Sequence, residues 1–353
     1  MKDPRSINSQ GDQDPRSRLP PAWASPGRRT ALAFVLALAV MGAGCSDSKR
    51  EQPAAAAAPP SAPPLRIDNV RRIAEGPAGQ LLVSDRRGWI VAVDKDSLQP
   101  VWGFQLPDEG APFGVAAWNQ LVFVGNTETK NVEVYRMVES GGGSTTLSFE
   151  YNLGGTAAGA TGTLQNPISI AIDQKAQRVF VLDGDEKKVK IYESTGPFVG
   201  AFEPRDSTGQ LLSPVSLAVD ETRQEVLVGD YGDPSGSSRA KTPARILIYD
   251  YAGALLFQIN GGPPTHWSTS FARVQGMAAS ADGRIFAADP LGNRILVLNR
   301  DSGALLSELG TEGVQPGELM LPLDVMLDAK SGDLFVSNNR GARRVEALRG
   351  AGS

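Results

Sequence analysis

The stretches of sequence that decide the fold are six copies of one strand motif: GQLLVSD (79–85), NQLVFVGN (119–126), QRVFVLD (177–183), QEVLVGD (224–230), GRIFAAD (283–289) and GDLFVSN (332–338). Each copy is an apolar run that ends on Asp or Asn, and further short apolar runs precede and follow it. A unit of strands and turns that returns every ~40–60 residues is typical of a β-propeller. We therefore expect an all-β fold with six blades.

Working outward from each copy gives a blade of four antiparallel strands, which we letter a to d from the central axis. Blade three is the clearest, with NPISIAID (166–173), RVFVLD (178–183), KKVKIYE (187–193) and FVGAFE (198–203). Blade six has no fourth strand after RRVEAL (343–348). We expect an N-terminal strand near 64–67 to supply it, because closure of the ring removes exposed sheet edges. Residues 65–353 are thus predicted to form a single propeller domain.

The N-terminal part of the chain has the layout of an export signal. Arg28 and Arg29 precede the apolar run ALAFVLALAVMGA (31–43), which is too short to span a bilayer but suits a signal peptide. Cys45 follows directly and is the only cysteine. This resembles a bacterial lipoprotein signal, so residues 1–44 are interpreted as a signal peptide with a long leading segment, and Cys45 as the lipidated residue. An ordinary cleavage site beside a chance cysteine is the alternative.

Residues 45–64 are rich in Pro and Ala and have too few large apolar residues to fold, so they are predicted to form an extended tether. By resemblance to lipoprotein sorting rules, Ser46 favours the outer membrane. We expect the propeller in the periplasm or at the cell surface. Residues 1–44 carry six Lys/Arg and three Asp/Glu, a net of +3, so the remainder carries −7 where the whole chain carries −4. An acidic exported protein is not expected to bind nucleic acid.

The chain resembles the NHL-repeat family of six-bladed propellers. The resemblance rests on the phrase P-x-S-[IL]-A-[IV]-D at 167–173 and 214–220, on NRILV (293–297), and on the segment 310–322 with its pattern G-x-x-G-x-x-P-G-E-L-x-L-P. It implies a propeller that serves interactions with other macromolecules.

The residues at the ends of the b strands form the first candidate site. They are Asp85, Asn126, Asp183, Asp230, Asp289 and Asn338. Such side chains either bind a cation or cap the following loop through its backbone N–H groups. Because the same residue types return in every blade, the sequence favours loop caps.

The starts of the a strands form the second candidate site, at the inner mouth of the channel. Aligned on Ser169, the ring consists of Arg71, Gly114, Ser169, Ser216, Gly276 and Asp324. A metal-dependent hydrolase needs several oxygen ligands converging there, and this ring offers a single carboxylate. Since blades one and six become neighbours on closure, we expect Arg71 and Asp324 to form a structural pair across the seam. No metal site and no cofactor are predicted, and calcium in the channel is the alternative.

His266 is the only histidine and lies in the loop GGPPTHWSTS (261–270). One histidine cannot build a zinc site of several histidines, and no G-x-S-x-G context supports a catalytic triad. We therefore predict no catalytic residues.

The b–c and d–a connections of a propeller lie on one face of the disc. The long connections here are nearly all of these kinds: 153–165, 204–212, 231–243, 260–273 and 310–320. Long loops in compact domains are often functional, although mobile insertions without function are the alternative. We expect Tyr231, His266 and Trp267 to anchor a partner, with Arg86, Arg87 and Arg340 as a charged rim.

The sequence thus favours a non-enzymatic, membrane-tethered module that binds or scaffolds an unidentified protein of the bacterial cell envelope. The alternative is a small-molecule hydrolase or lactonase that uses a cation in the channel. Six blades need no second subunit, so we expect a monomer.

Overall fold

The computed structural model describes residues 65–140, 144–155, 159–207, 209–233, 243–262, 271–341 and 344–352. All of them belong to one compact unit, Ala62–Ser353. The predicted signal peptide, Cys45 and the tether, residues 1–64, lie outside the described residues. No helix in the described ranges is long and apolar enough to cross a membrane.

The fold is a six-bladed β-propeller, as predicted. Blade one contains β1 (Val70–Glu75), β2 (Leu81–Asp85), β3 (Trp89–Val93) and β4 (Pro100–Gln105), and blade two contains β5 (Pro112–Trp118), β6 (Leu121–Asn126), β7 (Asn131–Ser140) and β8 (Ser144–Leu153). Blade three contains β9 (Pro167–Asp173), β10 (Arg178–Asp183), β11 (Lys188–Glu193) and β12 (Phe198–Phe202), and blade four contains β15 (Pro214–Asp220), β16 (Glu225–Asp230), β17 (Arg245–Asp250) and β18 (Leu255–Asn260). Blade five contains β19 (Met277–Ala279), β20 (Arg284–Asp289), β21 (Arg294–Asn299) and β22 (Leu305–Leu309), and blade six contains β25 (Pro322–Leu327), β26 (Leu334–Asn338) and β27 (Val345–Leu348).

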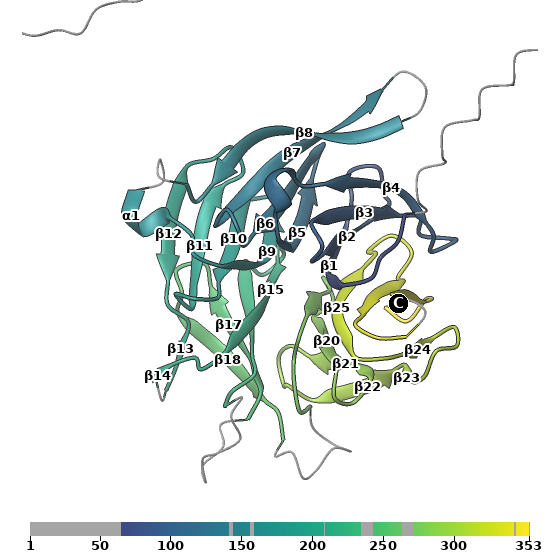
Figure 1. The fold of residues 1–353 in the computed structure, drawn as a ribbon. Helices are drawn as coiled ribbons and strands as arrows, with labels where there is room; N and C mark the ends of the chain where they lie inside the picture. The colour runs from purple at the N-terminus through teal and green to yellow at the C-terminus, as the bar shows by residue number, and fades with distance from the viewer. Residues whose placement is uncertain are drawn as a thin grey trace, which may run out of the picture. The chain divides into compact units, whose positions relative to one another are not determined.

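Within each blade, successive strands pair antiparallel in sequence order. Figure 1 shows the inner strands β1, β9, β15 and β25 around the centre and the outer strands β4, β8, β12 and β22 at the periphery. The connections between blades hold only short elements: η1 (Pro107–Glu109), α1 (Gly159–Gly162), β13 (Arg205–Asp206), β14 (Gly209–Gln210), β23 (Thr311–Glu312) and β24 (Glu318–Leu319).

The hydrophobic core consists of six clusters, one between each pair of neighbouring blades. Strands b and c of each blade supply side chains to both flanking clusters, which explains why the b strands read as continuous apolar runs. The cluster between blades six and one joins Val83 and Val91 to Phe335 and Val345, so the ring closes through packing.

The closing segment differs from the prediction. Blade six has three strands in the described structure, and residues 65–68 belong to no sheet. Leu65 and Ile67 nevertheless pack against the cluster between blades six and one. The backbone of this segment is committed to blade one instead, because the N–H groups of Asp68 and Asn69 donate to Asp85 Oδ2 at 2.8 and 3.0 Å. The segment therefore contributes side chains to the seam and not a hydrogen-bonded strand.

Candidate binding face and channel mouth

The face on which the a strands begin and the b strands end is called the loop face here. Register places Pro167 opposite Asp183 and Pro214 opposite Asp230, so each strand start lies beside a strand-end Asp or Asn. The b–c and d–a connections both lie on this face, as the sequence predicted.

The six strand-end residues cap the loops of this face. Asp183 accepts hydrogen bonds from the backbone N–H groups of Gln165 and Asn166 in one loop and of Asp185 and Glu186 in the next, at 2.7–3.2 Å. Asn126 does the same in blade two, where its Oδ1 accepts from the N–H groups of Ala111 and Glu128. Each of the six is at most 2% exposed. The loop-cap interpretation therefore describes their role.

Four of the six strand-end side chains also have a polar partner on strand c, which the sequence interpretation missed. Lys190 Nζ lies 3.2 Å from Asp183 Oδ2, Arg245 Nε lies 3.0 Å from Asp230 Oδ2, and Arg294 Nε lies 3.3 Å from Asp289 Oδ2. In blade two the strand-end residue is the donor and strand c supplies the carboxylate. Asn126 Nδ2 donates to Glu133 Oε1 at 2.9 Å. The signal was present as a charged residue near the start of strand c in blades two to five: Glu133, Lys190, Arg245 and Arg294.

The channel ring differs from the prediction in one blade. Val70 lies opposite Asp85, and the register shifts by a bulge between Val70 and Ile73. Arg72, two residues after Val70, is thus the equivalent of Ser169, Ser216 and Asp324 in the other blades. The ion pair with Asp324 accordingly belongs to Arg72, with 3.7 Å between Nη1 and Oδ1, and the predicted pairing of Arg71 was wrong by one residue.

Arg72 crosses the channel and binds the backbone of four other blades. Its Nε donates to Ile168 O at 3.5 Å, its Nη1 to Gln275 O at 2.6 Å and to Leu323 O at 3.5 Å, and its Nη2 to Val215 O. The side chain is only 4% exposed. Inward-facing carbonyl oxygens are natural ligands of hard cations. At this level of the channel, the guanidinium group of Arg72 occupies the position in which a cation would contact these carbonyl oxygens.

The small residues of the ring leave room for this arrangement. A Cβ atom added to Gly276 would lie 2.6 Å from Asp324 Cα, so any larger side chain collides with the ion pair. Burial raises the pKa of Asp324 to about 6, against which the charge of Arg72 and the N–H of Ile73 act. The ring is therefore a buried structural network.

On the far side of Arg72 the channel continues as a cavity of about 280 Å³. Its wall includes the residue two positions after the ring in each blade: Ala74, Ala116, Ala171, Ala218, Ala278 and Met326. Alanine in five blades keeps this part of the channel open. Glu75 and Gln174 lie near its outer end. The cavity faces away from the loop face.

The end of the channel on the loop face is lined by arginine and aromatic side chains. We call it the channel mouth and define it by Arg71, Arg86, Phe113, Tyr231 and Arg273. The guanidinium carbon of Arg71 lies 5.4 Å from the centroid of the Phe113 ring, and that of Arg273 lies 4.9 Å from the Tyr231 ring. The pKa of Tyr231 is raised by burial, and the charges of Arg72 and Arg273 oppose that rise. Tyr231 thus links the mouth to the buried Arg72.

The charged form of Arg71 is disfavoured at the channel mouth. Burial lowers its pKa, and the like charges of Arg86 and Arg72 lower it further. Its Nε atom is buried and has no hydrogen-bond partner in the described structure. Asp85 opposes this decrease in pKa, but Arg71 forms no ion pair with it in the described structure.

The predicted partner-binding residues fall into three groups. His266 and Trp267 lie outside the described residues. Tyr231 is partly buried at the mouth, so it offers an edge and not a free ring. Arg87 is held by Asp68 and Asp85, whereas Arg86 and Arg340 are exposed on the loop face.

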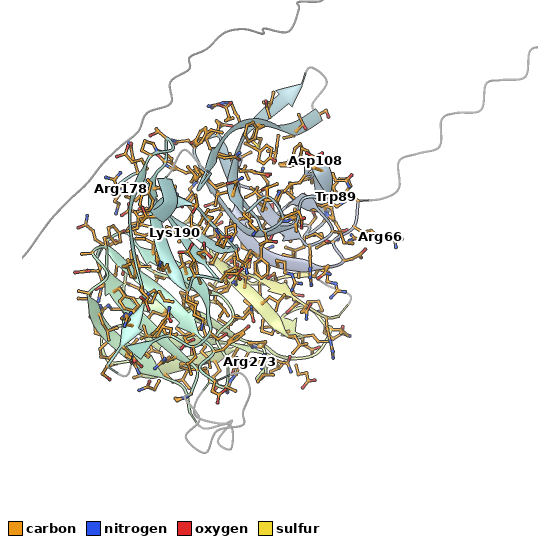
Figure 2. All side chains as sticks on the ribbon, turned by 60° about the vertical axis from the view of Figure 1, so that its left-hand side comes forward. Arg66, Trp89, Asp108, Arg178, Lys190 and Arg273 are labelled. Carbon is orange, nitrogen blue, oxygen red and sulfur yellow. The ribbon has the colours of Figure 1, made fainter. Side chains whose placement is uncertain are left out.

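Among the arginines that the structure describes, those without a carboxylate partner all lie on the loop face. Over the described ranges, those with an ion pair are Arg72, Arg87, Arg136, Arg178, Arg205, Arg223, Arg245, Arg284, Arg294, Arg300 and Arg349. The described arginines without one are Arg66, Arg71, Arg86, Arg273, Arg340 and Arg344, and all six lie on strand starts or connections of the loop face. Arg66 lies at the periphery, whereas Lys190, one of the paired cations, lies within the body of the propeller (Figure 2).

Comparison with known proteins gives a structural likeness only. No family model matches the chain, and no curated protein matches it. Among solved structures, the chain is similar to one described as Kuenenia stuttgartiensis hydrazine synthase, with a TM-score of 0.54 and 11% sequence identity over 83% of this chain and 99% of that chain. At this identity the likeness shows the propeller fold alone. The resemblance to NHL repeats stays a prediction.

Proposed function

We propose that this protein is a membrane-tethered, extracytoplasmic propeller that binds a protein of the bacterial cell envelope through its loop face. The observation that carries the proposal is the confinement of unpaired arginines to this one face. Exposed arginines without an ion-pair partner can steer and select a partner that presents carboxylates. A propeller supplies a rigid disc on which such a face is held in fixed geometry.

The sequence supports the tether independently of the fold. The apolar run 31–43, the single Cys45 and the Pro/Ala-rich residues 46–64 together suit a lipid anchor with a spacer. Replacement of Cys45 by Ala is expected to move the protein from the membrane fraction to the soluble fraction and to abolish labelling by a radioactive fatty acid. Membrane retention with unchanged labelling would refute the anchor.

Binding is tested by chemical crosslinking and co-purification of the full-length protein from native membranes. The test variant is Arg86→Gln/Arg340→Gln, which removes two exposed, unpaired charges of the loop face. The matched control is Arg136→Gln/Arg178→Gln, which removes two ion-paired charges elsewhere. We expect the wild type and the control to capture the same protein and the test variant to lose most of it. Equal capture by all three would reject the loop face as the binding surface.

A further inference from the structure

The channel mouth concentrates positive charge, which at Arg71 is opposed only in part, by the carboxylate of Asp85. Arg71, Arg86 and Arg273 have no carboxylate partner there, and Arg72 lies directly beneath. The carboxylates near Arg71 and Arg72 are already engaged. Asp85 accepts from the backbone N–H groups of Asp68, Asn69 and Arg87, and Asp324 pairs with Arg72.

Neighbouring like charges of this kind are unfavourable in the free protein. Burial and two nearby arginines both disfavour the charged form of Arg71, and its Nε atom has no acceptor. An anion placed beside Arg71 and Arg86 would offset the repulsion between them. The arrangement is therefore better suited to the bound state than to the free one.

The aromatic rings determine what kind of anion fits. The Phe113 ring lies near the guanidinium carbons of Arg71 and Arg72, at 5.4 and 5.7 Å from its centroid, and the Tyr231 ring lies 4.9 Å from that of Arg273. Contact with a ring through the face of a guanidinium group leaves its N–H edges free. Free guanidinium edges match the two oxygens of a carboxylate in bidentate geometry.

We propose that the channel mouth binds an acidic segment of the protein partner, with one carboxylate held at Arg71 and Arg86 and another at Arg273. The proposal rests on the proposed function and names the chemistry of its partner. A short segment suits the site better than an anionic membrane does. The loop face also carries Glu128 and Asp185 on the connections of blades two and three, and these would face a flat anionic surface.

The experiment measures fluorescence anisotropy of two labelled peptides with the full-length protein in detergent. One peptide alternates Glu and Gly, and the other has Gln in place of each Glu. The mouth variant is Arg71→Gln/Arg86→Gln/Arg273→Gln. The control variant is Arg136→Gln/Arg178→Gln/Arg223→Gln, which removes the same net charge from residues paired with carboxylates. The single variant Arg86→Gln is included because Arg86 is exposed and its loss does not threaten folding.

We expect the wild type to bind the Glu peptide and not the Gln peptide, with affinity that falls as salt rises. The mouth variant should lose at least about tenfold in affinity and Arg86→Gln about threefold, while the control changes less than about twofold. Equal losses in the mouth and control variants, or no binding of the Glu peptide by the wild type, would overturn the proposal. Binding of phosphatidylglycerol vesicles that depends on the mouth, without peptide binding, would replace it with a lipid site.

Partner capture separates this inference from the proposed function. If the mouth variant still captures the envelope protein from membranes, the loop face binds it through other residues, and only the acidic-segment inference fails. If the wild type captures no partner, the proposed function fails, while the peptide titration still reports on the chemistry of the mouth.

Discussion

Replacement of Arg72 by Met is predicted to be among the most destabilising single changes at the channel. The guanidinium joins blade one to blades three, four, five and six, with its shortest hydrogen bonds to Gln275 O and Val215 O. Methionine fills part of the same space without donors, so the carbonyl oxygens lose their partner and Asp324 loses its counter-ion.

The magnitude follows from the buried contacts. Each short hydrogen bond from a charged group contributes about 1.5–3 kcal/mol, and loss of one partner of a buried ion pair costs about 3–5 kcal/mol. These contributions overlap, and water entering from the cavity offsets part of them. We therefore expect a loss of about 3–5 kcal/mol, or a fall in Tm of roughly 6–10 °C for a domain of this size.

The assay is thermal unfolding followed by circular dichroism at one scan rate, because large propellers often unfold irreversibly. The matched control is Arg71→Met at the adjacent position, where no hydrogen bond or ion pair is lost within the described structure. We expect the control to change stability by less than about 1 kcal/mol. An equal loss in the two variants, or an unchanged Tm for Arg72→Met, would refute the assignment of Arg72 as the central tie.

Three further predictions concern the same network. The pKa of the Asp324 carboxyl is raised to about 6 in the folded protein, so its contribution to stability is complete below the pKa of the unfolded state and is lost as pH rises through 6. This contribution is worth about 3 kcal/mol. In Asp324→Asn, stability should therefore no longer decline as pH rises from 4 to 7. Urea unfolding at both pH values checks this, and an unaltered pH profile would contradict it. Lys190→Met should lower the free energy of unfolding by about 3–5 kcal/mol, because the Lys190 side chain is 0% exposed between Asp183 and Glu186. In a double-mutant cycle, adding Asp183→Asn should restore at least about 1 kcal/mol of that free energy. Strictly additive effects of the two substitutions would argue against the pairing. Gly276→Ala should destabilise the protein by at least about 1 kcal/mol, because the Cβ atom of the new alanine would lie 2.6 Å from Asp324 Cα. An unchanged stability in calorimetry would show that the channel ring is not tightly packed.

The blade count and the loop face could be predicted from the sequence because the motif repeats. Asp or Asn ends every b strand, and the structure uses all six residues to cap loops. A residue type that recurs at one position of every repeat reports a structural need that each blade shares. Four of the a strands also begin with Pro, which fixes their alignment: Pro112, Pro167, Pro214 and Pro322.

The first blade shows where such alignment ends. It has Val70 in place of proline and then two arginines in succession, so the sequence offers no means to choose between Arg71 and Arg72. The choice is made by the bulge between Val70 and Ile73, which turns Arg72 into the channel and leaves Arg71 at the mouth. A one-residue shift in a strand exchanges the two faces on which neighbouring side chains lie.

The closing segment illustrates a competition that sequence patterns do not reveal. Residues 64–67 are apolar enough to suit a strand, and Leu65 and Ile67 do enter the seam. Asp85, however, takes the N–H groups of Asp68 and Asn69, and Arg87 donates to Arg66 O. The same strand-end carboxylate that made the repeat recognisable therefore prevents the segment from pairing with β27.

Site-specific photo-crosslinking in cells identifies the face of the propeller that contacts a partner. A photoreactive amino acid is placed singly at Arg86 and Arg340 on the loop face, and at Asn119 and Lys330 in exposed turns between strands a and b on the opposite face. After irradiation of intact cells, the account predicts one and the same crosslinked protein from positions 86 and 340 and none from positions 119 and 330. Adducts of equal yield from both faces, or from the opposite face alone, would contradict the account.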